Sequence, residues 1–480
     1  MQRILVATLG IAGSLMASST PKYPFPYQAD YAYGIRVSPV PTTPDIQANF
    51  AAWKTTYYLE SPDGSKARIL WLDPTAANEY NGSCDMWKGS CTVSEGIGYG
   101  MLIAVYMDNA TNQTQSMFDK LWAYYQAYPD GNSLMNWEIN GFNGTVATGA
   151  ATDADVDVAL ALSMAYKQWG DSKYLAGAQT QLGHIWAKEV NSSSNLLTPD
   201  DQGTANLYDP SYFSTGALRV FPMVDNTSSH GWAKVADACL AFIAKNQNST
   251  TGLVSDWTNG NANPVSNQNS GNTAFGYDAV RTPWRMALDY YWFGTMAAQA
   301  NLNKIGNWIT SSTGRNVASI RADYNLDGTN DNTRNAIYTG AMLMATIGNP
   351  ADTAWIRQGY ANLNLANYWG WDGNYYNKNW KILDLLALSG NFQDFWGTVK
   401  PSGLFPVSAP VQDWSASTRP GFVDLRGRGT VRAQLLDLTG RILSQTSGVD
   451  RISLPRPTGR GVLLVRILGE HPRTLSVAAN

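Results

Sequence analysis

The sequence predicts an all-α domain followed by a small all-β domain. From about residue 44 to residue 390, apolar residues recur at spacings of three and four, which is typical of helices that bury one face. Loops rich in Gly, Asn, Asp and Pro separate these segments at intervals of roughly thirty residues, and no tight sequence repeat accompanies them. A closed ring of helix pairs therefore fits the spacing better than an open solenoid. After about residue 399 the pattern changes to short alternating runs, as in strands.

Ten segments of the long domain are predicted to be helices. Each carries apolar residues along one face, and polar loops join neighbouring segments. Two of the loops, at 136–152 and 250–277, are long. In chain order the expected helices lie at 45–60, 95–109, 116–128, 155–170, 173–190, 231–247, 283–301, 335–349, 351–367 and 379–391.

The first residues, 1–17, are predicted to be a secretory signal peptide. Arg3 precedes an apolar run from Ile4 to about Met16, and small residues follow, so cleavage is expected near Ala17. A buried N-terminal strand is the alternative interpretation. The run is too short to span a bilayer, and no later segment reaches the length of a membrane-spanning helix. We therefore expect an exported protein, secreted or held at the cell surface, without a membrane span.

The C-terminal part is predicted to be a linker over 397–420 and a small β-sandwich over 421–480. The linker contains Pro and Ser, and the four runs that follow it alternate between apolar and polar residues. No catalytic residues are evident in this module. The runs are TVRAQLLDLTGRIL, DRISLP, GRGVLLVRIL and RTLSVAAN.

Composition and charge narrow the functions that are open to this chain. With 34 basic and 37 acidic side chains among 480 residues, the net charge of -3 provides no strong field for nucleic acid or an acidic membrane. The 18 Trp and 25 Tyr are numerous, and many lie in polar segments. Core packing explains most aromatic residues, but this excess leaves room for platforms that face a ligand. We expect no nucleic-acid partner.

The cysteines and histidines indicate the compartment and argue against a metal. Cys84 and Cys91 bracket a short loop, and a local disulfide is expected there in an oxidising compartment. Cys239 lies on an apolar helical face and is expected to be a buried thiol. The three histidines are widely separated, so a histidine-based metal site is improbable and no cofactor is expected.

One segment, DYNLDGTNDNTR, is similar to a calcium-binding loop. Asp323, Asp327 and Asp331 stand in register, and Gly328 occupies the turn. The segment ends in Arg334 where such loops have glutamate. We expect a tight turn here, and these three aspartates are a better metal-ligand candidate than the run at Asp153–Asp157, which lacks the glycine and the final acid of a calcium loop.

Three acid-bearing segments carry the candidate chemistry. SEGIGYGM places Glu95 at a helix start, and ATDADVDVALAL places Asp153 and Asp157 one turn apart on one helix face. YDAVRTPWR places Asp278 before a helix, with Arg281 close behind. An acid at a helix start also favours the helix dipole, which is the structural alternative for each segment.

Hydrolysis of a glycosidic bond is one reaction that these acids would support. It needs one protonated carboxyl and one ionised carboxylate, and their environments must push the two pKa values apart. Arg281 is expected to hold Asp278 ionised, as a base requires. The helix start favours an ionised Glu95, so a second carboxylate must oppose this bias, and Asp153 is expected to supply it.

Taken together, the three segments resemble the family 8 glycoside hydrolases, which are endo-acting enzymes on β-1,4-linked glycans. The similarity covers 27–396, and Val158 is a mild departure at an apolar position of the family signature. The resemblance implies an (α/α)6 barrel and an inverting mechanism. It makes Glu95 the general acid and Asp278 the general base.

The same resemblance suggests residues that bind the sugar. Asp153 is expected to bind and distort the sugar at the cleavage point, and Tyr277 and Arg281 to support the base and its water. Trp137 in SLMNWEING and Tyr212 in DPSYFS resemble family binding segments. Each aromatic taken alone is more often part of a core. Further candidates for sugar stacking are Tyr208, Tyr376, Tyr375 and Trp87.

We therefore expect a secreted, monomeric endo-β-1,4-glucanase. An aspartate base in YDAVR points to the subgroup that contains cellulases and xylanases, so an endo-β-1,4-xylanase is the alternative. A non-catalytic glycan-binding protein is a further alternative, which the joint presence of the three acids disfavours. The glycines that follow Glu95, at 96, 98 and 100, are interpreted as clearance for a glycan and for neighbouring helices.

The C-terminal module resembles the sorting domains of type IX secretion substrates. LLDLTGRIL followed by GRGVLLVRI carries this similarity, although Leu463 replaces an aromatic residue. The resemblance implies that secretion machinery is a partner of this module. A small accessory domain that binds glycan is the alternative.

Overall fold

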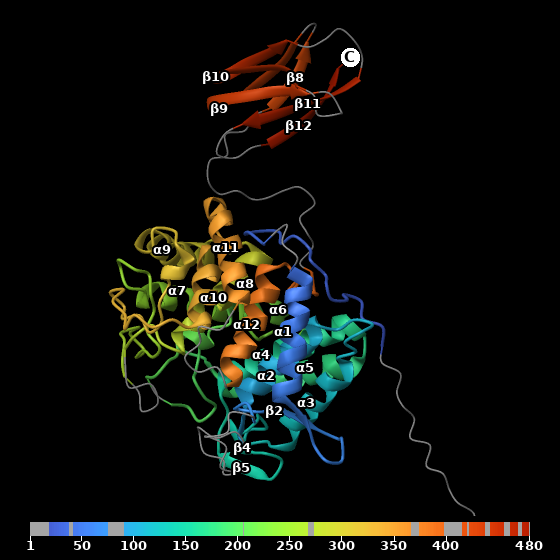
Figure 1. Cartoon of the computed structure of the whole chain (residues 1–480), viewed down its shortest axis with the longest axis vertical. Coiled ribbons are helices and arrows are strands. Elements are labelled where there is room, and N and C mark those ends of the chain that lie inside the picture. Colours follow the sequence, from blue (N-terminus) through green and yellow to red (C-terminus); the bar gives the residue numbers. More distant parts are fainter. Residues whose placement is uncertain are drawn as a thin grey trace, which may run out of the picture. The chain divides into compact units, whose positions relative to one another are not determined.

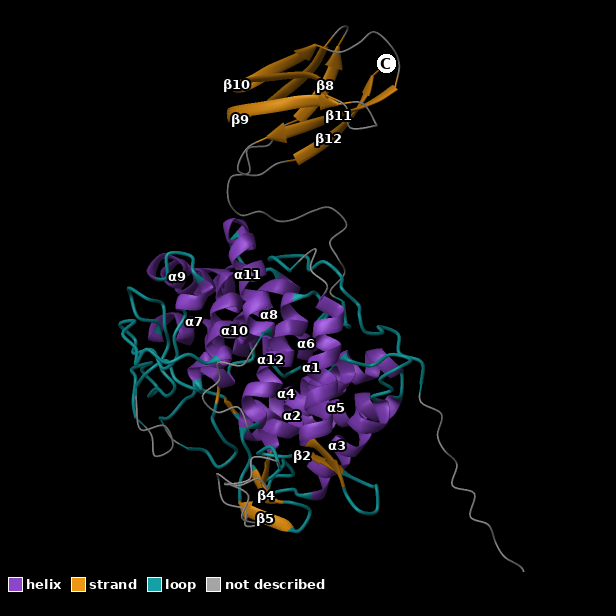
Figure 2. Cartoon of the chain, in the orientation of Figure 1, coloured by secondary structure: helices purple, strands orange, loops and turns teal. Residues whose placement is uncertain are grey.

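The chain divides into two compact units, residues 1–400 and 401–480, which are described separately below (Figures 1 and 2). The predicted signal peptide at 1–17 lies outside the described residues, and most of the predicted linker at 397–420 does too. The computed structural model describes residues 19–37, 42–74, 91–204, 206–266, 273–365, 374–397, 415–419, 422–436, 442–455, 461–468 and 473–479.

Six inner helices of the larger unit form a closed ring. Each contacts the next along the chain, and the last contacts the first. Every residue of the fifth inner helix is buried, as expected where neighbours cover a helix all round. The inner helices are α2 (Ser94–Tyr106), α4 (Thr152–Trp169), α6 (Thr215–Val220), α8 (Thr282–Phe293), α10 (Ala336–Thr346) and α12 (Tyr375–Leu388).

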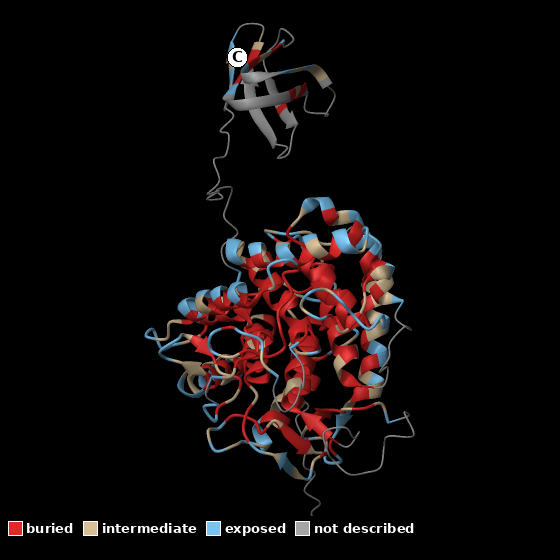
Figure 3. Cartoon of the chain, turned by 90° about the vertical axis from the view of Figure 1, so that its left-hand side faces the viewer, coloured by how far each residue is buried: buried red, intermediate tan, exposed pale blue. Residues whose placement is uncertain are grey.

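Outer helices alternate with the inner ones and complete an (α/α)6 barrel (Figure 2). Because successive helices run back and forth, the inner helices all begin at one end of the barrel, which is also where the outer helices end. Figure 3 shows the buried residues concentrated in the middle of this unit. The outer helices are α1 (Thr42–Tyr57), α3 (Gln115–Ala127), α5 (Ser172–Lys188), α7 (Trp232–Asn246), α9 (Met296–Ser312) and α11 (Thr353–Asn364).

The barrel has two helices more than the ten that the sequence predicts. The helix α6 was missed because it has only six residues, too few to show a period. The helix predicted at 283–301 is in fact α8 and α9, separated at Gly294, whose φ of 67° ends α8 in the left-handed conformation. In the described part of the chain, no helix is long and apolar enough to cross a membrane.

Short strands occupy loops of the larger unit. The three residues after α1, predicted as helix, form β1 (Tyr58–Glu60), which pairs with β2 (Ala67–Ile69). The long loop predicted at 136–152 contains β4 (Glu138–Asn140) and β5 (Gly144–Ala147). These pair in a three-stranded sheet with β3 (Cys91–Val93), which leads directly into α2. The remaining pair is β6 (Val190–Asn191) with β7 (Leu196–Leu197).

The structure describes two of the three cysteines. Cys91 is disulfide-bonded, whereas Cys84 lies outside the described residues. Cys239 is a free, buried thiol on α7.

The smaller unit is a five-stranded antiparallel sheet that folds over on itself. The long second strand pairs with the third along most of its length, and with the first and fourth at its two ends. The first and last strands also approach one another, around a core that includes Val423, Leu435 and Val465. The strands are β8 (Ser415–Arg419), β9 (Phe422–Leu436), β10 (Ile442–Pro455), β11 (Gly461–Leu468) and β12 (Arg473–Ala479).

The three glycines at the start of α2 allow close helix packing. A Cβ added at Gly98 would lie 3.1 Å from Cβ of Asp157, and one at Gly100 would lie 3.0 Å from the side chain of Ile69. A Cβ at Gly96 would lie 3.3 Å from the ring of Tyr375. The predicted clearance for neighbouring elements is therefore correct. The predicted clearance for a glycan is wrong, because protein atoms fill the space and all three glycines are buried.

This packing predicts opposite effects of the same substitution at two helical glycines. Gly98→Ala should destabilise the barrel by about 1–3 kcal/mol, because its methyl group is pressed against α4. Gly183→Ala on α5 has no atom within 4 Å of the new methyl and should stabilise by about 0.5–1 kcal/mol. Thermal unfolding followed by circular dichroism tests both. A Gly98→Ala variant that melts at or above the parent temperature would contradict this description.

Candidate active site

Four carboxylates surround the guanidinium of Arg281, at the end of the barrel where the inner helices begin. Nη1 donates to Oδ2 of Asp153 at 2.5 Å and to Oε2 of Glu95 at 3.0 Å. Nη2 donates to Oδ1 of Asp278 at 2.9 Å and to Oδ2 of Asp209 at 3.4 Å. We call these five residues the Arg281 cluster.

The barrel brings this cluster together from four separate segments. Glu95 and Asp153 lie in the first turns of α2 and α4, which are neighbours in the inner ring. Asp209 caps a short 3-10 helix, Pro210–Tyr212, that leads towards α6. Asp278 precedes a second one, Ala279–Arg281, that leads into α8. Each acid therefore stands at or just before the start of an inner helix.

Only two of the four acids are open to solvent. The side chains of Glu95 and Asp278 are 19% and 31% exposed. Asp153 and Arg281 are each 1% exposed, and Asp209 is fully buried. Glu95 and Asp278 are thus the members of the cluster that a ligand can reach. The other three members, Arg281, Asp153 and Asp209, are buried beneath them.

The environment of Glu95 favours its protonated form. The pKa of Glu95 is raised to about 8, chiefly by burial, although Arg281 opposes this shift. The charge on Asp153 contributes to the rise, and the hydroxyl of Tyr375, which donates to Oε1 at 2.7 Å, opposes it. The carboxylate that the sequence predicts as the opposing charge therefore acts in the predicted direction. The larger cause is burial, which the sequence pattern did not reveal.

Asp278 is held by two donors. One oxygen accepts from Arg281, and the other accepts from the indole nitrogen of Trp257 at 2.9 Å. Burial raises the pKa of Asp278 above its ordinary value, and the opposing effects of Arg281 and then of the Trp257 hydrogen bond do not cancel this rise. The sequence predicted only the lowering by Arg281. Trp257 was missed because it lies in the loop at 250–277, where no periodicity places a side chain.

A further buried acid fixes the backbone around Asp278. Oδ1 of Asp256 accepts from the backbone N–H of Gly276 at 2.9 Å and from that of Ala279 at 2.7 Å. These two residues flank Tyr277 and Asp278 in the chain. Asp256 therefore clamps the turn that carries the exposed carboxylate. Its sequence context, SDW, gave no signal of this role.

A second ion pair lies one helical turn below the cluster. Both carboxylate oxygens of Asp157 accept from the guanidinium of Arg285, and both side chains are buried. Asp155, which lies between Asp153 and Asp157 in the chain, points elsewhere and accepts from the hydroxyl of Tyr125, as the helix period predicts. Removing one partner of a buried pair costs about 3–5 kcal/mol, so this contact joins α4 firmly to α8.

Four of the predicted tyrosines border the cluster, and one of them, Tyr375, is the buried residue whose hydroxyl donates to Glu95. Tyr277 is 41% exposed, and its hydroxyl accepts from Asn335 at 3.0 Å. The hydroxyl of Tyr376 donates to the backbone carbonyl of Tyr277. The ring of Tyr212 lies 5.2 Å from the guanidinium carbon of Arg281. Among these rings, that of Tyr277 offers the most open surface to a ligand.

Tyr208 and Trp137 are the two other predicted aromatics among the described residues. Tyr208 is buried beside Phe242, with its backbone paired to Thr258, so it packs in the core instead of offering a free ring. Trp137 is half-buried, and its carbonyl accepts from the backbone N–H of Ser94 at 2.9 Å, beside the start of α2. Trp87 lies outside the described residues.

The candidate calcium loop has turn geometry. Asp327 accepts from the backbone and hydroxyl of Thr329, and Asp331 accepts likewise from Thr333. Asp323 accepts from the hydroxyl of Tyr338 at 2.8 Å. Within the described ranges, no three His, Cys, Asp or Glu side chains are grouped so that they could hold a metal ion. Asp323, Asp327 and Asp331 are therefore not gathered around one point in this structure.

The arrangement suits acid–base hydrolysis. One exposed carboxyl is kept protonated, and a second, which accepts from two N–H donors, is suited to carry the charge. The two are linked through opposite nitrogens of one guanidinium. A bond placed between them could receive a proton on one side and a water molecule on the other.

Comparison with known proteins gives a consistent result. Residues 85–389 match the family model described as glycosyl hydrolases family 8. Endoglucanase 2 of Ruminiclostridium josui is 31% identical over 404 residues, which cover 80% of each chain. Endoglucanase A of Acetivibrio thermocellus is 29% identical over 93% of this chain and 91% of its own. The apo structure of a β-1,3-1,4-glucanase from Paenibacillus sp. X4 superposes with a TM-score of 0.69 and 26% identity, over 78% of this chain and 99% of its own.

The backbone clamp predicts different outcomes for two substitutions of one residue. Asp256→Ala removes both hydrogen bonds to the turn, and a displacement of about 1 Å at Asp278 should lower kcat on a soluble β-glucan about 10²-fold. Asp256→Asn keeps an oxygen that can accept from both N–H groups and should retain most of the activity. The reducing ends released per second give kcat for each variant. Equal losses in both variants, or none in Asp256→Ala, would show that these hydrogen bonds do not position Asp278.

Proposed function

The chain belongs to family 8 of the glycosyl hydrolases and is an endoglucanase, and we propose that it is exported and cleaves internal β-1,4 bonds of cellulose or mixed β-glucan with inversion. The observation that carries the mechanism is the pairing of a protonated Glu95 with Asp278 across one guanidinium. Both side chains are partly open to solvent, as a polymeric substrate requires.

The proposed reaction is a single displacement. Glu95 donates its proton to the glycosidic oxygen, and the bond from that oxygen to the anomeric carbon breaks. A water molecule attacks the anomeric carbon from the opposite face, and Asp278 takes a proton from this water. At the end Glu95 is ionised and Asp278 is protonated, so proton exchange with solvent restores both groups. The new hydroxyl has the inverted configuration.

The linkage through Arg281 supports this geometry. Inverting enzymes need their two carboxyl groups about 6.5–9.5 Å apart so that water fits beside the sugar. Hydrogen bonds of 3.0 and 2.9 Å to different nitrogens of one planar group keep Glu95 and Asp278 separate without letting them drift far apart. The rigid fork of a guanidinium suits this spacing role better than a flexible lysine would.

The remaining members of the site have supporting roles in this proposal. Asp153 raises the pKa of Glu95 and holds Arg281, and its contact with the distorted sugar stays a prediction. Tyr277 offers an exposed ring beside the base, where a sugar can stack. Every member of the Arg281 cluster comes from one chain, which supports action as a monomer.

Export is proposed from the two ends of the chain. The N-terminal residues have the charge, apolar run and small residues of a signal peptide. The C-terminal residues form a separate compact unit, whose sequence is similar to type IX sorting domains. We propose that this unit addresses the enzyme to secretion machinery and that the larger unit carries the catalysis.

The assignment of acid and base predicts the effect of two isosteric substitutions. Glu95→Gln and Asp278→Asn should each lower the hydrolysis of cellohexaose by about 10²–10⁴-fold, because each removes one proton transfer. Asp327→Asn, in an exposed turn, is the matched control and should keep full activity. The products are followed by chromatography, with xylohexaose as a parallel substrate to test the xylanase alternative. Full activity of either site variant would refute the assignment, provided that its circular dichroism spectrum is unchanged.

A further inference from the structure

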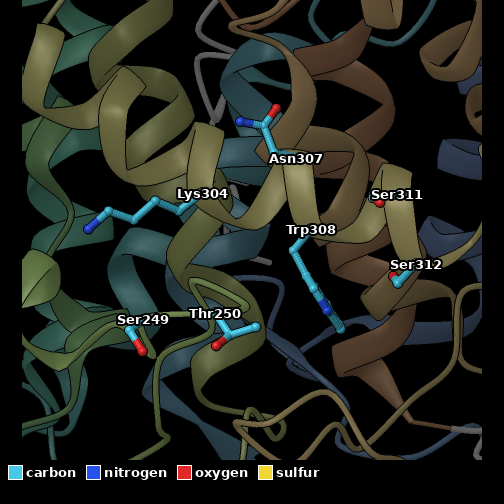
Figure 4. Close-up of a pocket in the computed structure, with 7 residues that line it drawn as sticks. All are labelled: Ser249, Thr250, Lys304, Asn307, Trp308, Ser311 and Ser312. Atoms are coloured by element: carbon cyan, nitrogen blue, oxygen red, sulfur yellow. The ribbon is translucent and has the colours of Figure 1, made fainter.

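A polar groove with one indole in its wall lies between the end of α9 and the segment that follows α7 (Figure 4). Its volume is about 470 Å³, which is within the range of about 300–1,000 Å³ that ligand sites occupy. Lys304 is its only charged lining residue, and none of the described lining residues is acidic. The other lining residues are Ser249, Thr250, Asn307, Trp308, Ser311 and Ser312.

The indole of Trp308 is held in a fixed position. Its ring packs edge-on against Tyr324, with the ring centres 5.2 Å apart. Gly328 lies against the same ring, and its φ of 91° and the lack of space for a Cβ make glycine necessary there. In Figure 4 the indole projects from α9 with Thr250 on one side and Ser312 on the other. The ring is half-buried, so part of it is open to the groove.

The chemistry of this groove matches a neutral sugar. A pyranose ring presents C–H groups that pack on an aromatic face, and hydroxyls around its edge that exchange hydrogen bonds. The groove supplies an indole, four side-chain hydroxyls and one amide. The six polar side chains that line it, four hydroxyls, the amide and the ammonium group, are all exposed on helix or turn surfaces, where a ligand replaces water and no buried partner is lost. A single ammonium group is a poor basis for recognising a strongly charged ligand.

The location connects this groove to the catalytic end of the barrel. It is formed by the C-terminal part of α9 and by residues just after α7, and the outer helices end where the inner helices begin. The carbonyl of Tyr324, whose ring supports Trp308, accepts from the backbone N–H of Phe275 at 2.9 Å. Phe275 leads into Tyr277 and Asp278, so one loop separates the groove from the site.

We propose that the groove around Trp308 is a second glycan-binding site, which holds a segment of the same β-glucan polymer that the Arg281 cluster cleaves. The inference rests on the proposed function, because that function supplies the ligand class. A chain bound there stays near the catalytic end between cleavage events. The groove therefore raises the affinity for polymer without taking part in the chemical step.

Two substitutions test the groove by different means. Trp308→Ala removes the stacking surface, and Ser311→Arg fills the groove while leaving the contacts of Trp308 intact. Ala300→Arg adds the same side chain to an exposed position of α9 outside the groove and is the matched control. All are made in the full chain and assayed on soluble mixed-linkage β-glucan and on cellotetraose, with retardation in β-glucan-containing gels as a direct measure of binding.

The expected result separates polymer from short substrate. Trp308→Ala and Ser311→Arg should both raise KM for the polymer by about 2- to 12-fold, weaken retardation in the gel, and leave kcat/KM for cellotetraose unchanged. Ala300→Arg should behave as the parent enzyme. Unchanged polymer KM and retardation in Ser311→Arg would overturn the proposal, even if Trp308→Ala is impaired through its packing on Tyr324. Binding lost only on addition of phosphate would instead indicate an anion at Lys304. Absence of all hydrolysis in the parent enzyme would refute the proposed function itself.

Discussion

The site depends on the imbalance between four carboxyl groups and the single guanidinium that they share. Among the described residues, Arg281 is the guanidinium that touches Glu95, Asp153, Asp209 and Asp278, whereas Arg285 pairs with Asp157. Four ionised carboxylates around a single cation would leave a large uncompensated charge away from water, which is strongly unfavourable. The cluster must therefore retain protons at neutral pH. Burial directs one of them to Glu95, which is the acid that a substrate can reach. A proton donor thus results from the charge balance of the whole cluster.

The fold of the barrel brings these acids together around one guanidinium and also holds them in position. A closed ring of inner helices brings their starts to one end, and an acid stands at or just before the starts of α2, α4, α6 and α8. Gly98 on α2 lets this helix approach α4 closely, and the pair of Asp157 with Arg285 joins α4 to α8 below the cluster. Asp256 fixes the turn that carries Asp278. Catalytic geometry is therefore set by packing several residues away from the reacting atoms.

The sequence predicts the parts of this structure that local patterns encode. Helical periodicity predicted ten segments, which cover all of the described barrel helices except α6, with α8 and α9 joined as one. The motifs that resemble the family identified Glu95, Asp153, Asp278 and Arg281. Contacts between distant segments carry no local pattern. Trp257 is 21 residues from Asp278 in the chain, and Asp209 is 72 residues from Arg281, so only the folded ring brings them together. Burial is equally non-local, which is why the dominant cause of the raised pKa of Glu95 could not be read from its helix start. Helix boundaries are limited in the same way, because neither the break at Gly294 nor the short helix α6 was predicted.

The most direct test of this charge balance is the pH dependence of kcat/KM on a soluble cello-oligosaccharide. Glu95 can donate a proton only while it is protonated, so activity should fall as the pH rises through about 8. Asp278 can accept a proton only while it is ionised, so activity should also fall as the pH decreases. Because the pKa of Asp278 is raised, this fall should occur at a pH above 3.8, the ordinary pKa of an aspartate. The predicted profile is a bell with its alkaline limb near pH 8. An alkaline limb near 4.5, the ordinary pKa of a glutamate, would contradict the claim that the cluster keeps Glu95 protonated.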